Sequence, residues 1–334
     1  MTSESKILNI GVLGCSQIVP RSIINPLKGV GCISAYGIAS RHSENAVTYS
    51  EKYNIPNVFE SYEDLLASNE IDFVYIALPN HLHKDWVIKA AYAGKHIMVE
   101  KPLCITLKEL DEMKEACLKR NVHLLEGLMV QHHPWQEYIK EAIFDRRYGK
   151  LINTNTQISF IPKDNFSGNY RSRPEYGGGT FYDLASYWIQ FLQCIGDINS
   201  ADYDGNSDFK GPNGCDWTFH GHLNFYDGCH SNFTASFEMP YTAKHEMRFE
   251  KAVLTVEDFF RANLGNYKIN ITIEELNEGA THKVSFPPQC YYTNQLLFFY
   301  DVITGQRTNI DIEESYERQA LMENIYCKAR AKIK

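Results

Sequence analysis

Short apolar runs and segments with helical spacing alternate through the first 127 residues of this 334-residue chain. The apolar runs read as strands, and they lie at 7–14, 33–39, 71–78, 94–99 and 122–126. The intervening segments carry apolar residues at helical spacing, at 45–53, 62–67, 81–93 and 106–120. Such alternation builds βαβ units, which assemble into a parallel sheet with helices on both faces. We therefore predict a doubly wound α/β domain over residues 1–127.

The pattern changes after residue 127. Strand-like runs at 219–225 and 229–237 have a period of two and meet at Asp227-Gly228, a strong hairpin signal. Other strand-like runs lie at 151–161, 247–256 and 269–276, helical patterns lie at 135–144, 179–195 and 314–331, and 203–213 reads as a surface loop. Strands in succession without helices between them favour an antiparallel sheet. Residues 128–334 are therefore predicted to form an α+β domain with a large, mostly antiparallel open sheet and a C-terminal helix at 314–331.

Composition excludes several classes of partner. The net charge of −8 and the pI near 5.9 argue against nucleic acid and anionic membranes. No apolar stretch approaches the roughly 20 residues of a membrane span, and the polar N-terminus does not resemble a signal peptide. The nine cysteines are scattered without a C-x-x-C pair, so we expect a reducing, cytoplasmic setting.

The first apolar run ends in a glycine turn, Gly11-x-x-Gly14, followed by Cys15, Ser16, Gln17 and Ile18. A turn between a strand and a helix can hold a pyrophosphate with backbone N–H groups and the helix dipole. The strict G-x-G-x-x-G pattern is not met, because Ser16 and Val19 stand in place of the second and third glycines. Serine is small enough for close approach, so a dinucleotide site is expected. The alternative is an ordinary tight turn.

The end of the second strand bears on the choice of dinucleotide. An NAD site needs an acidic residue here to bind the ribose 2′-hydroxyl. This chain has Ser40 and Arg41 instead, and the first acid is Glu44. A guanidinium beside a hydroxyl suits a 2′-phosphate, so we predict NADP(H) in preference to NAD(H). The alternative is a solvated arginine on a loop.

Further candidate residues lie at the ends of the next two strands of the predicted sheet, at the edge where ligands bind in doubly wound domains. Leu78, Pro79, Asn80 and His83 follow one strand, and Glu100-Lys101-Pro102 ends the next. We expect all of these residues except Pro102 to line the cofactor site. For His83, a bond from the ring to the backbone at the helix start is an equal alternative.

Five segments, in order, resemble the glucose–fructose oxidoreductase / inositol dehydrogenase family. They are the glycine turn, 78–83 (LPNHLH), 100–102 (EKP), 126–134 (EGLMVQHHP) and 176–188 (YGGGTFYDLASYW). The resemblance covers nearly the whole chain and implies a Rossmann domain followed by an open-sheet domain. It also implies association through that sheet, as a homodimer or homotetramer. The apolar alternation at 152–160 and 219–237 is sufficient for such an interface, unless this face packs on the domain's own helices.

The resemblance implies that Lys101, Asp183 and Tyr187 face the nicotinamide and the substrate. Many members carry histidine where Tyr187 stands. A tyrosine at this position resembles the branch of the family that contains glucose–fructose oxidoreductase, dihydrodiol dehydrogenase and sugar-nucleotide ketoreductases. Gln131 stands where an arginine often occurs, which leaves its role open. Arg171 is predicted either to reach the nicotinamide or an anionic substrate group, or to form a structural ion pair.

The chemistry of these side chains is consistent with hydride transfer. Reduction of a carbonyl leaves an alkoxide that needs a proton, and a phenol has a reference pKa of about 10. An ammonium near the phenol lowers its pKa and stabilises the oxyanion. We therefore assign Tyr187 as general acid/base and Lys101 as its electrostatic partner. Asp183 lies one helical turn from Tyr187 and orients the substrate. The alternatives are a core tyrosine and a solvated lysine.

Three functions remain open. The first is an NADP(H)-dependent oxidoreductase acting on a carbonyl or hydroxyl carbon of a sugar, sugar nucleotide or cyclitol. The second is an imine or dihydrodiol-type oxidoreductase, and the third is a non-catalytic NADP-binding sensor, which would be expected to lose Lys101 or Tyr187. His220, His222 and His230 suggest a metal, but they lack Cys or carboxylate partners at metal-site spacing, so we predict none.

Overall fold

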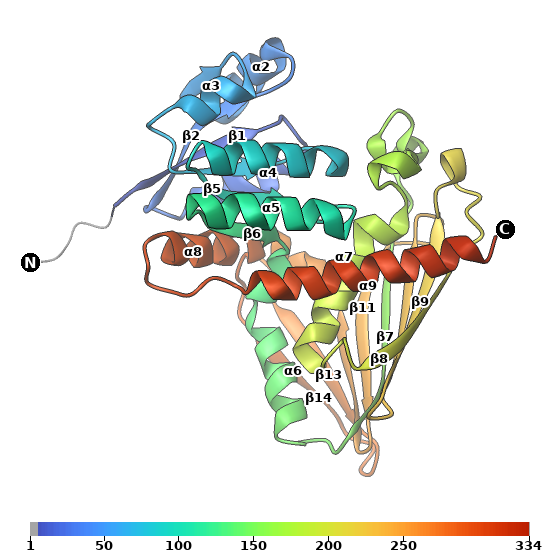
Figure 1. Cartoon of the computed structure of the whole chain (residues 1–334). Helices are drawn as coiled ribbons and strands as arrows, with labels where there is room; N and C mark the ends of the chain where they lie inside the picture. The colour runs from blue at the N-terminus through green and yellow to red at the C-terminus, as the bar shows by residue number, and fades with distance from the viewer. Residues whose placement is uncertain (1–5, 334) are drawn as a thin grey trace, which may run out of the picture. The chain divides into compact units, whose positions relative to one another are not determined.

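The computed structural model describes residues 6–333 and divides the chain into two units. The first unit holds the chain up to Met129 together with Cys290–Ser315. The second holds Val130–Gln289 together with the chain from Tyr316 onward. Figure 1 draws both units with their helices and strands labelled.

The described residues of the first unit form a six-stranded parallel sheet in the order β3-β2-β1-β4-β5-β6. This order confirms the predicted doubly wound domain. The strands are β1 (Leu8–Leu13), β2 (Ile33–Ala39), β3 (Asn57–Phe59), β4 (Phe73–Ile76), β5 (His96–Glu100) and β6 (Leu124–Gly127). The helices before β6 are α1 (Asn25–Leu27), α2 (Ser43–Tyr53), α3 (Tyr62–Ala67), α4 (His83–Tyr92) and α5 (Leu107–Arg120).

Local sequence signals account for these helix boundaries. Thr106 and Glu109 form a capping box at the start of α5, with the Glu109 N–H donating to Thr106 Oγ1 at 3.3 Å. Ser61 caps α3 by accepting the Asp64 N–H at 3.0 Å. The helix expected after β1 is short: a π-helical turn at Pro20–Ile24 leads into α1. Proline lacks an N–H, which limits continuous helix here.

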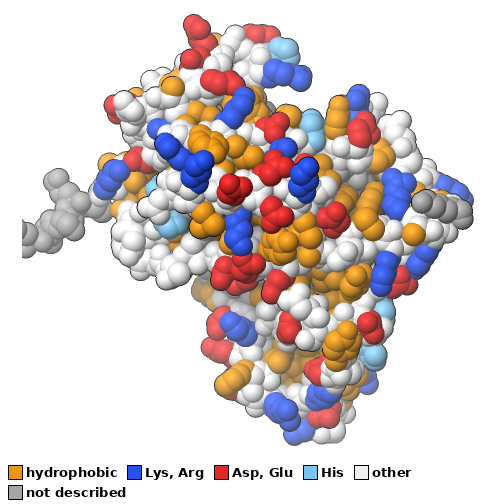
Figure 2. Space-filling model, in the orientation of Figure 1, with side chains coloured by type: hydrophobic (Ala, Val, Ile, Leu, Met, Phe, Trp, Pro, Cys, Tyr) orange, Lys and Arg blue, Asp and Glu red, His pale blue; other side chains and the backbone are white. Residues whose placement is uncertain are grey.

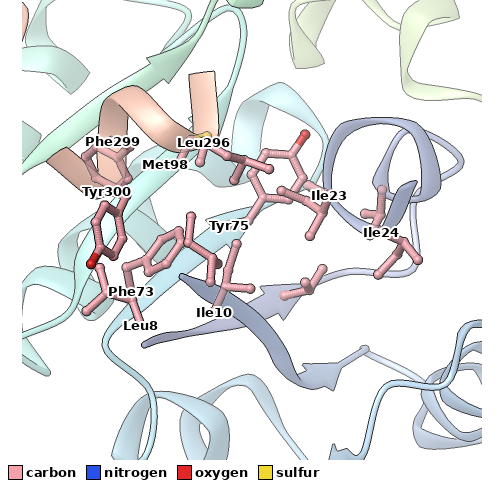
Figure 3. Close-up of a cluster of buried hydrophobic side chains, with 14 of the residues drawn as sticks. Leu8, Ile10, Ile23, Ile24, Phe73, Tyr75, Met98, Leu296, Phe299 and Tyr300 are labelled. Atoms are coloured by element: carbon pink, nitrogen blue, oxygen red, sulfur yellow. The ribbon is translucent and has the colours of Figure 1, made fainter. Parts of the chain in front are cut away.

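The segment Cys290–Ser315 returns to the first unit. The sequence pattern predicts it as part of the second domain, with no helix between residues 290 and 313. Its helix α8 (Tyr291–Ile303) packs on the parallel sheet, as the cluster in Figure 3 shows. The Phe73 and Phe299 rings meet edge to face with centroids 5.7 Å apart. A helical pattern does not identify the sheet on which the helix will pack, which explains the difference.

The second unit contains the predicted antiparallel sheet, with β7 and β10 paired parallel in its middle. Among the described residues it has eight strands in the order β14-β13-β12-β11-β7-β10-β9-β8. They are β7 (Leu151–Ser159), β8 (Ala201–Asn206), β9 (Thr218–Phe225), β10 (His230–Ser236), β11 (Thr242–Phe249), β12 (Ala252–Glu257), β13 (Ile269–Glu275) and β14 (Thr281–Phe286). Helices α6 (Pro134–Phe144), α7 (Thr180–Ile195) and α9 (Ile312–Ala331) complete the chain (Figure 1).

Two strand predictions need correction. The expected loop at 203–213 begins inside β8, an edge strand whose polar residues lack a continuous apolar pattern. Only Ala201 and Gly205 of this strand are buried, so little in its sequence indicates a strand. The run at 247–256 is two strands, β11 and β12, because the chain turns between Phe249 and Ala252.

The apolar face of the large sheet is covered by the unit's own helices, which is one of the two alternatives predicted for its Phe and Leu residues. Trp188 of α7 stacks on Phe233 at 4.7 Å, and Phe181 lies 4.3 Å from Phe219, ring centroid to centroid. The other face is polar. There His222 shares hydrogen bonds with Asn232 and Asn224, each at 2.8 Å.

Among residues 6–333, no three His, Cys, Asp or Glu side chains gather in a way that could hold a metal ion. No helix in the same range is long and apolar enough to cross a membrane. On the face drawn in Figure 2, basic and acidic side chains are mixed, which fits a chain of modest net charge.

Candidate functional site

Gly14 directly follows β1 at the carboxyl edge of the parallel sheet, whereas Gly11, which the sequence places in the same turn, lies inside the strand. Gly14 has φ +101°, and a Cβ there would lie 2.9 Å from the carbonyl oxygen of Ala77, which follows β4. The position therefore requires glycine for both conformation and space. Ser16 is half-buried, and its carbonyl accepts the Tyr49 hydroxyl at 2.9 Å. This tight turn, in a βαβ unit, fits the approach of a pyrophosphate to the backbone.

The end of β2 lies next to this turn. Ser40 is buried and forms a hydrogen bond with Cys15, whose pKa is raised mainly by burial. Arg41 is exposed, and its backbone N–H donates to the Tyr62 hydroxyl at 3.2 Å. An exposed guanidinium beside the turn fits a phosphate ligand.

His83 joins the ends of β4 and β5. Its Nδ1 lies 2.9 Å from the carbonyl oxygen of Pro102, and its Nε2 lies 2.9 Å from that of Leu78. The ring is fully buried, and burial lowers its pKa despite these two bonds. The His83 ring therefore bonds to backbone carbonyl groups of the two loops, as one of the two alternatives predicts, and it does not point to solvent.

Lys101 is half-buried in the loop that His83 holds. On the other side of this loop, the Leu103 N–H donates to Glu126 Oε1 at 3.0 Å. Glu100, directly before the lysine, accepts the hydroxyl of Tyr75, and burial raises its pKa. The position of Lys101 thus depends on Glu126 of β6, a residue that the sequence analysis leaves unassigned because its partner is a backbone group 23 positions away.

Helix α7 carries the other predicted catalytic residues. Its residues from Thr180 to Leu192 are buried, including Asp183 and Tyr187, each 7% exposed. The Tyr187 ring lies edge-on to Phe260 with centroids 4.8 Å apart. A charged group on a buried helix is costly unless it has a partner of opposite charge, and an arginine pairs with Asp183.

Arg171 forms that ion pair, and its contact with the nicotinamide or with a substrate group remains a prediction. Its Nε lies 3.1 Å from Asp183 Oδ2, and its Nη2 donates to Oδ1 at 3.1 Å. The guanidinium also lies over the ring of Tyr170, 4.8 Å from its centroid. A fork-like contact of this kind fixes the orientation of the carboxylate.

The triple glycine before α7 is tightly packed. A Cβ at Gly178 would lie 2.6 Å from the carbonyl oxygen of Arg173, and one at Gly179 would overlap the carboxylate of Asp216. The sequence analysis does not identify Asp216, because its contacts are with glycine and helix residues more than 30 positions earlier in the chain.

Lys101 lies in the first unit, and Asp183 and Tyr187 lie in the second. The structure brings Asp183, Tyr187 and Arg171 onto one helix and its preceding loop. Residues 14–18, 40–41, 78–83 and 100–101 follow or end parallel strands, at the carboxyl edge of that sheet. The approach of Lys101 to Tyr187 remains a prediction.

Two family models match the chain in sequence order. The oxidoreductase family model with an NAD-binding Rossmann fold matches residues 8–128, and the GFO/IDH/MocA C-terminal domain model matches residues 137–255. The chain therefore belongs to the GFO/IDH/MocA oxidoreductase family, as its motifs predict.

Sequence relatives with known names agree with this assignment. The chain is 27% identical to D-xylose 1-dehydrogenase (NADP(+)) 2 of Haloferax volcanii over 95% of both chains. It is 29% identical to the dTDP-3,4-didehydro-2,6-dideoxy-alpha-D-glucose 3-reductase of Actinomadura kijaniata, over 55% of this chain and 54% of the relative. The match to the reductase thus spans about half of that relative's length.

The fold matches the crystal structure of KijD10, a 3-ketoreductase from Actinomadura kijaniata in complex with NADP and TDP-benzene. The TM-score is 0.88 over 97% of this chain and 98% of the other, at 21% identity. At this identity the likeness shows a shared fold.

Proposed function

We propose that this oxidoreductase transfers hydride between NADP(H) and the carbonyl or hydroxyl carbon of a sugar, sugar nucleotide or cyclitol. The observation that carries the proposal is a polar pair on a buried helix: Asp183 and Tyr187 lie one turn apart on α7, and Arg171 holds Asp183. The named relatives, a xylose dehydrogenase and a sugar-nucleotide reductase, favour carbohydrate substrates.

The cofactor would be held at the carboxyl edge of the parallel sheet. Gly14, Cys15, Ser16, Gln17 and Ile18 of the glycine turn would bind the pyrophosphate. Gly11 lies inside β1, close to Leu65, and would support the turn from within the sheet. Ser40 and Arg41 would bind the 2′-phosphate, and Leu78, Pro79, Asn80 and Glu100 would contact the remainder. The nicotinamide supplies or accepts the hydride when it is bound.

The protein's own groups then handle the proton and the developing charge. Tyr187 donates a proton to the oxygen that becomes a hydroxyl, or removes it in the reverse direction. Lys101 stabilises the phenolate and the oxyanion by its positive charge. Asp183 accepts a hydrogen bond from a substrate hydroxyl, since a carboxylate has acceptor sites beyond those that Arg171 uses.

A substrate panel tests this proposal. NADPH oxidation and NADP+ reduction would be followed with aldoses, nucleotide-linked ketosugars, cyclitols, a cyclic imine and a dihydrodiol. We expect turnover with a carbohydrate and a decrease of ~10²-fold or more in the Lys101→Ala variant. Lys89→Ala is the matched control, because Lys89 pairs with Glu63 at the surface of the same unit.

The panel also separates the alternative functions. Turnover confined to the imine or the dihydrodiol would replace the carbohydrate assignment. Tight NADPH binding without turnover of any substrate would favour a sensor protein. Equal activity in Lys101→Ala and the unmodified protein would remove the lysine from the mechanism.

The proposal includes a homodimer or homotetramer that associates through the open face of the large sheet. This face is polar, with Asn155, Asn232 and His222 in one hydrogen-bonded row, so the interface would be polar as well. Light scattering in dilute buffer measures the mass, and a monomer at micromolar concentration would contradict this part of the proposal.

A further inference from the structure

Asp216, which precedes β9, supplies the hydrogen-bond acceptors at the start of helix α7. Its Oδ2 accepts the Phe181 N–H at 2.7 Å and the Thr180 hydroxyl at 2.8 Å. Its backbone carbonyl accepts the Thr180 N–H at 3.0 Å. The residue before the helix is Gly179, which has no side chain to cap it. A residue 36 positions away in sequence from Thr180 therefore performs the capping role.

The other carboxylate oxygen lies against the glycine turn. Oδ1 of Asp216 is fully buried, and it has no hydrogen-bond partner within residues 6–333. A Cβ at Gly179 would overlap this oxygen, and Gly179 has φ +99°. The carboxylate is thus packed directly on the backbone that leads into α7.

The same turn is bonded to the loop that carries Arg171. The Gly179 N–H donates to the carbonyl oxygen of Arg171 at 2.9 Å. The thiol of Cys215 lies 3.6 Å from that oxygen. Asp216, the glycine turn and the Arg171 loop therefore form one hydrogen-bonded assembly at the helix start.

Helix α9 contacts the segment that contains Asp216. Arg330 donates to the carbonyl oxygen of Gly214 at 3.0 Å, and its guanidinium lies 4.0 Å from the centroid of Phe209. The ring of Tyr326 packs on Tyr182 of α7 with centroids 4.9 Å apart.

We infer that Asp216 is a positioning residue, which caps α7 and thereby sets the placement of Asp183 and Tyr187 for catalysis. The inference rests on the proposed function for its kinetic consequence. Its structural part, the cap, depends only on the contacts within the second unit. An anion at a helix N-terminus interacts favourably with the helix dipole, so the charged form of Asp216 is the better cap.

The charge of Asp216 changes near neutral pH. The titratable and charged groups that face it are Tyr182 of α7, Tyr326 and Arg330 of α9, and the adjacent Cys215. Burial raises the pKa of Asp216 to about 7, although the helix N–H, the Thr180 hydroxyl and Arg330 oppose the shift. As the pH falls through this value, the carboxylate gains a proton. The hydrogen bonds that it accepts from Phe181 and Thr180 weaken, while the cost of burying its charge is removed.

The Asp216→Asn substitution tests the inference, because asparagine keeps the shape and removes the charge. We expect kcat to fall between about 10-fold and 100-fold, with the KM for NADPH within twofold, since small displacements of catalytic groups reduce turnover strongly. The acidic limb of the kcat profile near pH 7 should disappear. Asp197→Asn is the matched control, because Asp197 accepts the Asn199 N–H just beyond the other end of α7. An unchanged kcat and pH profile in Asp216→Asn would overturn the inference.

Hydrogen exchange gives a second test, which needs neither a variant that folds nor a known substrate. In the unmodified protein, the protection factor of the Phe181 amide should change several-fold between pH 5.5 and pH 8.5, with a midpoint near 7, because the carboxylate that accepts this N–H changes its charge. A protection factor that is constant over this range would contradict the cap. A pH-dependent cap in a protein that turns over no substrate would instead refute the proposed function.

Discussion

Arg171 and Asp183 form an ion pair in which Nε lies 3.1 Å from Oδ2 and Nη2 lies 3.1 Å from Oδ1. The pair links the loop before the triple glycine to the helix that carries Tyr187. It orients a buried carboxylate that would otherwise be free to rotate, and it neutralises its charge.

Arg171→Ala should lower kcat/KM for the sugar substrate by about 10²-fold, because a partly buried charge pair is broken and Asp183 loses its orientation. Steady-state kinetics on the substrate found in the panel measures this. Arg173→Ala is the control, since Arg173 is exposed two positions further along the same loop. Equal kcat/KM values for Arg171→Ala and Arg173→Ala would show that the ion pair has no catalytic role.

Arg41→Ala should raise the KM for NADPH at least about tenfold and leave that for NADH nearly unchanged, because only NADPH carries the 2′-phosphate. Initial rates with both cofactors measure this. Lys52→Ala, at the end of α2, removes a positive charge from the same unit and controls for a general effect of charge. Equal losses with both cofactors would refute the assignment of the phosphate site.

Gly179→Ala should destabilise the protein by several kcal/mol, because the new Cβ would overlap Asp216 in a conformation that alanine rarely adopts. Gly168→Ala separates the two causes: Gly168 also has positive φ, at +71°, but a Cβ there meets no atom within 4 Å. Denaturant unfolding measures both variants. A loss of stability in Gly179→Ala no larger than that in Gly168→Ala would argue against the contact with Asp216.

The buried ring of His245 should make the folded protein less stable in acid. The ring stacks on Phe191 at 4.2 Å and on Phe259 at 4.4 Å, and burial lowers its pKa to about 3. The folded state therefore keeps the ring neutral, whereas the unfolded chain binds a proton below about pH 6.5. The free energy of unfolding should fall as the pH drops from 6.5 towards 3, by up to about 1.4 kcal/mol per unit.

His245→Phe should reduce this dependence, and the exposed His282→Gln should leave it unchanged. The half-buried His96 and the buried His133 also contribute to it, because burial lowers the pKa of each ring. Denaturant titrations between pH 4 and 7 would measure the slope. The raised pKa of Asp216 acts with the opposite sign, since the folded state holds its proton to higher pH and loses stability as the pH rises from about 4 to 7. An identical slope in His245→Phe and the unmodified protein would contradict the buried neutral ring.

The doubly wound domain could be predicted because its strands are nearly continuous apolar runs, as in β4, where each residue is buried. The Thr106–Glu109 capping box could also be predicted, since both residues lie within one helical turn. These features depend on residues that are close together in the sequence.

The remaining features depend on partners that are distant in the sequence. Phe299 of α8 packs on Phe73, more than 200 positions earlier, so its helix could not be assigned to the first unit from pattern alone. Asp216 follows no motif, and its role is visible only beside Gly179. The role of Arg171 was left open for the same reason, because an arginine on a loop gives no indication of which carboxylate it will meet.

The central claim is that the hydroxyl of Tyr187 transfers the proton. Its most direct test is kcat for Tyr187→Phe compared with Tyr182→Phe, since Tyr182 is a buried tyrosine on the same helix that packs on Tyr326. The account predicts that Tyr187→Phe lowers kcat by ~10²-fold or more while NADPH binding stays within twofold, and that Tyr182→Phe keeps most of its activity. A kcat in Tyr187→Phe equal to that of the unmodified protein would contradict it.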